Sequence, residues 1–182
     1  MGCWGITAFE SDAGLDAVCC IRRSLPKDGK LELDAVIQRL QQDSWNRPAD
    51  VSEGISHTSP MALAEMMFQL IDHDLSRLDY PDEGVGKDKK FGILTSFQAS
   101  KDALQWLRDY LSGTLQSAVE NARQKGDWGG WFQKKDWERW KEHMASLVEH
   151  LDNLLALPGD TMDLLTVQQP EMGRSWDNRR GV

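Results

Sequence analysis

A stripe of apolar side chains towards the C-terminal end is the strongest constraint on the fold of this chain. Its members recur at steps of three and four residues, which keeps them on one side of an α-helix. They are Trp137, Trp140, Met144, Leu147, Leu151 and Leu154. Pro158 and Gly159 follow, and this pair is typical of a helix end. The pattern predicts an amphipathic helix over residues 136–157 that buries one face.

Two further long helices are indicated by their leucines and their first residues. Ser100 is a good N-cap for a helix over 101–124, which Gly113 weakens in its middle. Ser59, followed by Pro60 at the first helical position, begins a helix over 60–78. Shorter helices fit residues 12–24 and 31–42.

These segments together predict a mainly α fold, a single-domain bundle of five or six helices. Residues 91–97 are apolar and suit a short extended segment, but no partner strand is evident, so we expect no sheet there. Residues 160–182 contain few apolar side chains and are predicted to form a loosely held tail. The helical domain is accordingly placed at residues 1–159.

Composition and charge limit the functional classes to which this protein can belong. The chain has 182 residues, of which 40% are hydrophobic, and a formal net charge of -8. No apolar run is long enough to span a bilayer, so we expect a cytoplasmic protein. The negative charge disfavours nonspecific nucleic-acid binding and favours a basic partner. Three cysteines, two of them adjacent, suit reduced thiols rather than a disulfide framework.

The first residues, MGCWGITAFESD, contain two glycines and two large aromatic side chains. A myristoylation site would need Ser or Thr where Ile6 stands, so a lipid anchor is not expected. We expect Gly2 and Gly5 to allow close backbone approach while Trp4 and Phe9 fill the core.

Asp12 and Asp16 follow four residues apart and share one face of a helix. Such a pair can act as an acid and a base, or bind a cation. The favoured interpretation is that these carboxylates stabilise the positive N-terminus of the helix.

This opening resembles that of an uncharacterised bacterial family, domain of unknown function 4259. The matching residues are Met1, Gly2, Trp4, Gly5, Phe9, Asp12 and Asp16. Cys3, Thr7, Glu10 and Ser11 depart from the family's pattern. The resemblance covers about a tenth of the chain and implies a bacterial cytosolic protein with a structural N-terminal motif. It implies no activity.

Two groups of residues are candidates for protein binding. The acidic run over 65–86 contains Asp72, Asp79 and Glu83 and would present a negative surface to a basic partner. Trp128 and Trp131 lie in a glycine-containing loop and would suit a protein contact or, less well, the stacking of nucleic-acid bases.

The four histidines offer one candidate metal site. His57, with Asp72, His73 and Asp74, would supply nitrogen and oxygen ligands to a divalent cation. The spacing matches no known helical metal motif. His143 and His150 flank the apolar stripe and are expected on a solvated surface.

No complete catalytic motif is present, so we expect a non-catalytic interaction protein without a cofactor. An immunity or antagonist protein that neutralises a basic partner is one form it would take. The alternative is a small metal-dependent hydrolase that uses the four residues above. A third hypothesis is a nucleic-acid adaptor that uses the two loop tryptophans.

Overall fold

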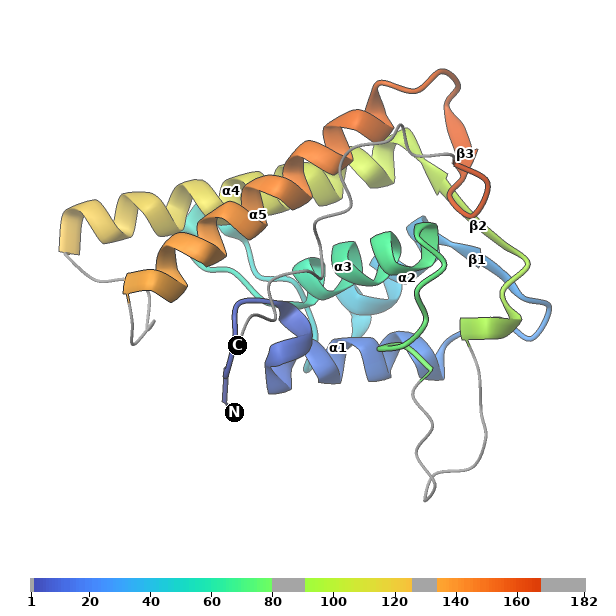
Figure 1. The fold of residues 1–182 in the computed structure, drawn as a ribbon, viewed down its shortest axis with the longest axis horizontal. Coiled ribbons are helices and arrows are strands. Elements are labelled where there is room, and N and C mark those ends of the chain that lie inside the picture. The colour runs from blue at the N-terminus through green and yellow to red at the C-terminus, as the bar shows by residue number, and fades with distance from the viewer. Residues whose placement is uncertain (1, 80–90, 126–133, 168–182) are drawn as a thin grey trace, which may run out of the picture.

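The computed structural model describes residues 2–79, 91–125 and 134–167 (Figure 1). Its main helices are α1 (Asp12–Arg23), α2 (Leu33–Gln42), α3 (Ser59–Ile71), α4 (Lys101–Lys125) and α5 (Lys134–Leu155). The strands are β1 (Lys30–Glu32), β2 (Ser96–Ser100) and β3 (Thr161–Asp163). Single turns of 3-10 helix are η1 (Ala8–Glu10), η2 (Val51–Glu53) and η3 (Phe91–Ile93). The prediction of a mainly α fold with a minor extended segment is confirmed.

Helix α3 is the centre of the molecule. It lies between α1 on one side and the pair of α4 and α5 on the other (Figure 1). All of its residues except Gln69 are buried. A helix that is apolar all round needs neighbours on every side, and here α1, α4 and α5 supply them.

Helices α4 and α5 pack side by side along most of their length (Figure 1). The predicted stripe of α5 is buried from Trp137 to Leu154. Ser100 caps α4, since its Oγ accepts a hydrogen bond from the Ala103 amide at 3.1 Å. Helix α4 continues through Gly113, and the missing side chain at this position lets Val51 of η2 pack closely against the helix.

A small sheet at one end of the molecule has the order β1-β2-β3 (Figure 1). Strands β1 and β2 are parallel, with Leu31 opposite Phe97, and β2 and β3 are antiparallel. The expectation that residues 91–97 have no partner strand was therefore wrong. The two partners are only three residues long, too short for an alternating pattern to reveal them.

The predicted domain boundary at residue 159 lies too early in the chain. Strand β3 belongs to the supposed tail, and Leu164 immediately after it is completely buried. The Leu164 amide donates to the Phe97 carbonyl at 2.8 Å. Residues 160–167 are therefore part of the fold, and residues 168–182 lie outside the described part of the chain.

Helix α3 is shorter than the predicted helix over 60–78. It ends in a Schellman motif, in which the Asp74 amide donates to the Gln69 carbonyl at 2.9 Å and the His73 amide to the Leu70 carbonyl at 3.1 Å. His73 takes the left-handed position with φ 55°. No glycine or proline marks this end, so the sequence pattern gave no sign of it.

A buried hydrogen bond joins the N-terminal segment, α3 and α5. The Nε2 atom of His143 lies 2.7 Å from Oε1 of Glu65, and both side chains are less than a tenth exposed. The same carboxylate accepts the backbone amides of Ala8 at 2.9 Å and Phe9 at 3.4 Å. The expectation that His143 is solvated was wrong, and Glu65 does not belong to an acidic surface.

Candidate functional site

The structure separates the residues of the predicted metal site. His57 lies just before α3, whereas Asp72, His73 and Asp74 follow its last residue. A helix of this length spans about 20 Å, so the four side chains do not converge on one ion. Within the described ranges, no group of three or more His, Cys, Asp or Glu side chains could hold a metal.

The acidic run is not one continuous surface. The carboxylate of Asp79 is only 5% exposed, accepts the amides of Phe91 at 3.1 Å and Gly92 at 2.5 Å, and lies 3.8 Å from a guanidinium nitrogen of Arg22. Asp79 therefore anchors η3 and is not presented to a partner. Asp72 is exposed, and partial burial of its carboxyl raises its pKa. Glu83 lies outside the described residues, as do Trp128 and Trp131.

The aromatic residues of the N-terminal motif are not both placed as predicted. Phe9 is buried, whereas Trp4 is 62% exposed, so the prediction that Trp4 fills the core was wrong. Gly5 lies so close to the Glu10 carboxylate that a Cβ atom would collide with it.

Both aspartates of the motif lie on α1. Asp12 accepts the Gly2 amide at 2.6 Å in the first turn of the helix, which holds the chain end against it. Asp16, one turn later, is exposed and lines a hollow between α1 and α2.

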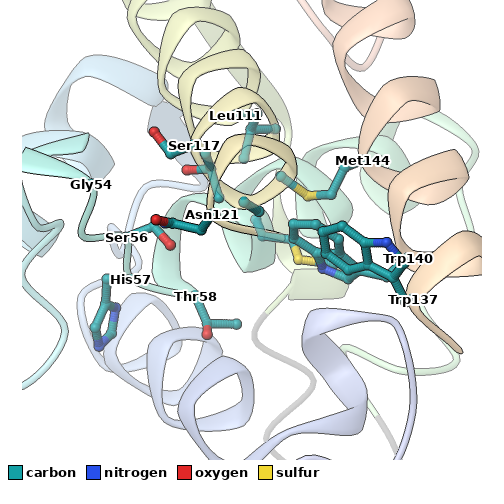
Figure 2. A pocket seen from close by; sticks show the side chains of 13 residues that line it. Gly54, Ser56, His57, Thr58, Leu111, Ser117, Asn121, Trp137, Trp140 and Met144 are labelled. Atoms are coloured by element: carbon teal, nitrogen blue, oxygen red, sulfur yellow. The ribbon is translucent and has the colours of Figure 1, made fainter. Parts of the chain in front are cut away.

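A second hollow, of about 300 Å³, lies where α4 and α5 meet the segment that leads into α3 (Figure 2). We call it the hairpin hollow. Gly54, Ser56, His57 and Thr58 contribute its wall from the segment before α3. Helix α4 contributes Leu111, Thr114, Ser117 and Asn121, and α5 contributes Trp137, Trp140 and Met144.

One side of the hairpin hollow is apolar and aromatic. The rings of Trp137 and Trp140 stack with centroids 5.4 Å apart and an angle of 18° between their planes. Figure 2 shows this pair beside Met144, across the hollow from Ser56 and Asn121. Both tryptophans are buried, which agrees with the predicted apolar stripe.

The other side carries small polar groups. Thr114 is 9% exposed, and its buried Oγ1 has no hydrogen-bond partner among the described residues. Ser117 and Asn121 follow at steps of three and four on α4, so the three side chains share one helix face. A molecule in the hollow can therefore supply a hydrogen bond that the described residues leave unmade.

His57 is held in one orientation at the edge of the hairpin hollow. Its Nδ1 accepts the Ser59 amide at 3.2 Å and lies 2.8 Å from Ser59 Oγ. Its backbone amide donates to Tyr110 Oη at 2.9 Å. Since Nδ1 accepts, the proton of the neutral ring is on Nε2. Burial lowers the pKa of His57 below its ordinary value, so the ring is uncharged at neutral pH.

His57 and Ser59 do not form a pair of general base and nucleophile in this structure. The Ser59 hydroxyl also donates to the Asn46 carbonyl at 2.7 Å, so its proton is already engaged. In the described part of the chain no carboxylate contacts His57 to orient it, which a triad would require. The hollow offers apolar contact and hydrogen bonds without charge.

Some residues of this site were predictable from sequence patterns. The stripe that contains Trp137 and Trp140 was correctly assigned to the core, and one edge of it forms the hollow. His57 was selected as a ligand for a metal and instead belongs to a neutral polar wall. Thr114, Ser117 and Asn121 were missed, although their spacing on one helix face was a readable signal.

No protein-family model, curated protein or solved structure matches this chain. The resemblance of its opening to domain of unknown function 4259 therefore stays a prediction. None of the described helices is both long enough and apolar enough to cross a membrane.

Proposed function

We propose that this protein is a non-catalytic interaction module that binds a basic protein partner, with its contact surface centred on the hairpin hollow. In a bacterium, which the resemblance of the opening implies, such a module would act as an immunity or antagonist protein. The observation that carries the proposal is the chemistry of the hollow. Its lining is uncharged at neutral pH and includes the hydroxyl of Thr114, for which no described residue is a hydrogen-bond partner.

An apolar side chain of the partner fits this lining. It would pack against the wall made by Met144 and the two tryptophans, while its backbone or a polar group pairs with the α4 face. Central, well-packed pockets that take one anchor side chain contribute most of the affinity in many interfaces.

The net charge of the chain favours a basic partner, although the exposed Arg139 and also Lys141, whose Nζ lies 5.3 Å from the Trp137 ring centroid, adjoin the lining. The chain carries a net charge of -8, and two exposed carboxylates flank the lining in sequence. Glu53 precedes Gly54, and Glu120 precedes Asn121. Charges at the rim of an interface mainly raise the association rate, and salt screens them.

The partner can be identified by placing a photo-crosslinking amino acid in the hollow. We expect a probe at Asn121 to capture one basic protein, while a probe at the exposed Arg123 on the same helix does not capture it. Binding is then measured with that purified protein, at two salt concentrations.

A substitution that fills the hollow tests the site directly. Ser117→Trp should weaken binding at least tenfold, about 1.4 kcal/mol, with little change in the melting temperature. The matched control is Gln116→Trp, at an exposed neighbouring position. Equal affinities of the two variants would place the interface elsewhere.

No observation among the described residues favours the metal-dependent hydrolase, because its four predicted ligands do not converge on one ion. It would be supported if the purified protein retained stoichiometric metal and lost hydrolytic activity on His73→Ala. That result would overturn the non-catalytic proposal.

A further inference from the structure

A separate hollow of about 260 Å³ lies between α1 and α2, and we call it the α1–α2 hollow. It shares no lining residue with the hairpin hollow. Three features of this second hollow point to a ligand: two arginines, an exposed tryptophan, and a buried amide oxygen that no described residue hydrogen-bonds.

The two arginines come from different helices. Arg23 lies in the last turn of α1 and Arg39 in the last turn of α2, and both are exposed. Among the described residues, no carboxylate lies within 4 Å of either guanidinium group. Two such groups can pair with a phosphate or carboxylate, and the carboxylates of Asp16 and Asp43 line the same hollow beside them.

The carboxylate of Asp43 in the same hollow is already engaged. Its Oδ1 accepts the amides of Trp45 at 3.0 Å and Asn46 at 2.9 Å, and the Asn46 side chain at 3.0 Å. These hydrogen bonds hold the pKa of Asp43 below its ordinary value. Asp43 therefore orders the turn after α2, where Trp45 is 63% exposed beside the hollow.

Asn46 has one hydrogen bond missing. The residue is 5% exposed, and its Nδ2 is bound to Asp43, which fixes the orientation of the amide. Its buried Oδ1 has no partner in the described part of the chain. A buried acceptor of this kind calls for a donor, and a ligand N–H group can supply it.

We propose that the α1–α2 hollow binds a nucleoside monophosphate. The planar base stacks on Trp45 and donates an N–H to Asn46 Oδ1, while the phosphate pairs with Arg23 and Arg39. Inorganic phosphate would use only the arginines, and an uncharged ring would leave them unused. The same chemistry occurs at the end of a single-stranded nucleic acid, but the net charge of -8 repels a longer polyanion.

The test is titration of the full chain with AMP, GMP, CMP and UMP by isothermal calorimetry. We expect saturable binding of at least one nucleotide at millimolar or lower concentration. Arg23→Gln and Arg39→Gln should each weaken it about tenfold or more, as expected when a charged hydrogen bond is lost. Arg123→Gln removes the same charge at an exposed position on α4 and should leave binding unchanged.

The stacking contact has its own matched control. Trp45→Ala should weaken nucleotide binding about tenfold, whereas Trp4→Ala, at a tryptophan of equal exposure, should not. Circular dichroism of each variant establishes that it is folded. Because Trp45 and the arginines are exposed, these variants are expected to fold.

Three results would overturn this proposal. The first is the absence of saturable binding for all four nucleotides. The second is inorganic phosphate binding as tightly as the nucleotides, which would remove the role of the base. The third is an oligonucleotide binding more tightly than its mononucleotide, which would indicate a nucleic-acid surface instead.

Discussion

His73 takes a backbone conformation that residues with a Cβ atom rarely adopt. Its φ of 55° closes the Schellman motif after α3, a position where glycine is the usual residue. The side chain is exposed, so the packing of the core does not compel histidine there.

Replacing His73 by glycine should therefore stabilise the protein. We expect His73→Gly to raise the free energy of unfolding by about 1 kcal/mol, since glycine adopts the left-handed region without steric cost. Urea denaturation measures this. His73→Ala keeps a Cβ atom and should give no such gain; a similar gain for both variants would show that backbone strain is not the cause.

The two aromatic residues of the N-terminal motif differ sharply in environment, and their substitution should show it. Trp4→Ala should change stability by less than about 0.5 kcal/mol, as is usual for surface sites. Phe9→Ala should cost roughly 3–5 kcal/mol, the range for a buried aromatic. Thermal denaturation of both variants distinguishes them, and a large loss for Trp4→Ala would contradict its exposed position.

At the scale of elements, the sequence predicted those helices and helix ends that depend on the spacing of neighbouring residues. The stripe of α5 and the cap of α4 at Ser100 follow from residue spacing and are confirmed. The pairing of β2 with β3 was not predictable, because it joins residues more than 60 positions apart through strands of three and five residues.

The candidate site was less predictable than the fold. The hairpin hollow forms where the segment before α3 comes together with α4 and α5. No pattern within one segment of the sequence indicates that these segments come together. The partner of Glu65 was hidden for the same reason, since His143 lies 78 residues later and flanks an apolar stripe.

The contact between Glu65 and His143 should be important for holding α5 to α3. Glu65→Leu leaves the amides of Ala8 and Phe9 without their acceptor and should cost roughly 3–5 kcal/mol. The double variant Glu65→Leu/His143→Leu should lose less than the sum of the two single changes, because the contact is shared. Urea denaturation of all four proteins gives the coupling energy, and additive losses would show that the contact contributes little.

Considered as a whole, the molecule should lose stability in acid in two stages. Burial lowers the pKa of His57 below 6.5, so the unfolded chain takes up that proton first. Stability from this group is complete above pH 6.5 and is lost as the pH falls below it. Asp43 and Asp74 have lowered pKa values through hydrogen bonds, so their contribution is lost only below their ordinary value of 3.8.

The first stage can be assigned by substitution. In His57→Gln the loss that begins below pH 6.5 should shrink, whereas His73→Gln, at an exposed histidine, should keep it. The measurement is the midpoint of urea denaturation from pH 8 to pH 3. An unchanged profile in His57→Gln would assign the first stage to another group.

The small sheet also constrains how this protein can be made on a ribosome. Its central strand β2 leaves the ribosome with β1 already available, but β3 is synthesised about 60 residues later, after α4 and α5. Until β3 is synthesised, one edge of β2 is unpaired and Phe97 lacks its hydrogen bond from Leu164. Glu65 likewise lacks its buried partner until His143 is synthesised. Such late contacts across the chain make nascent intermediates prone to aggregation. Cooperative folding of the described residues is thus expected only after β3 has left the ribosome.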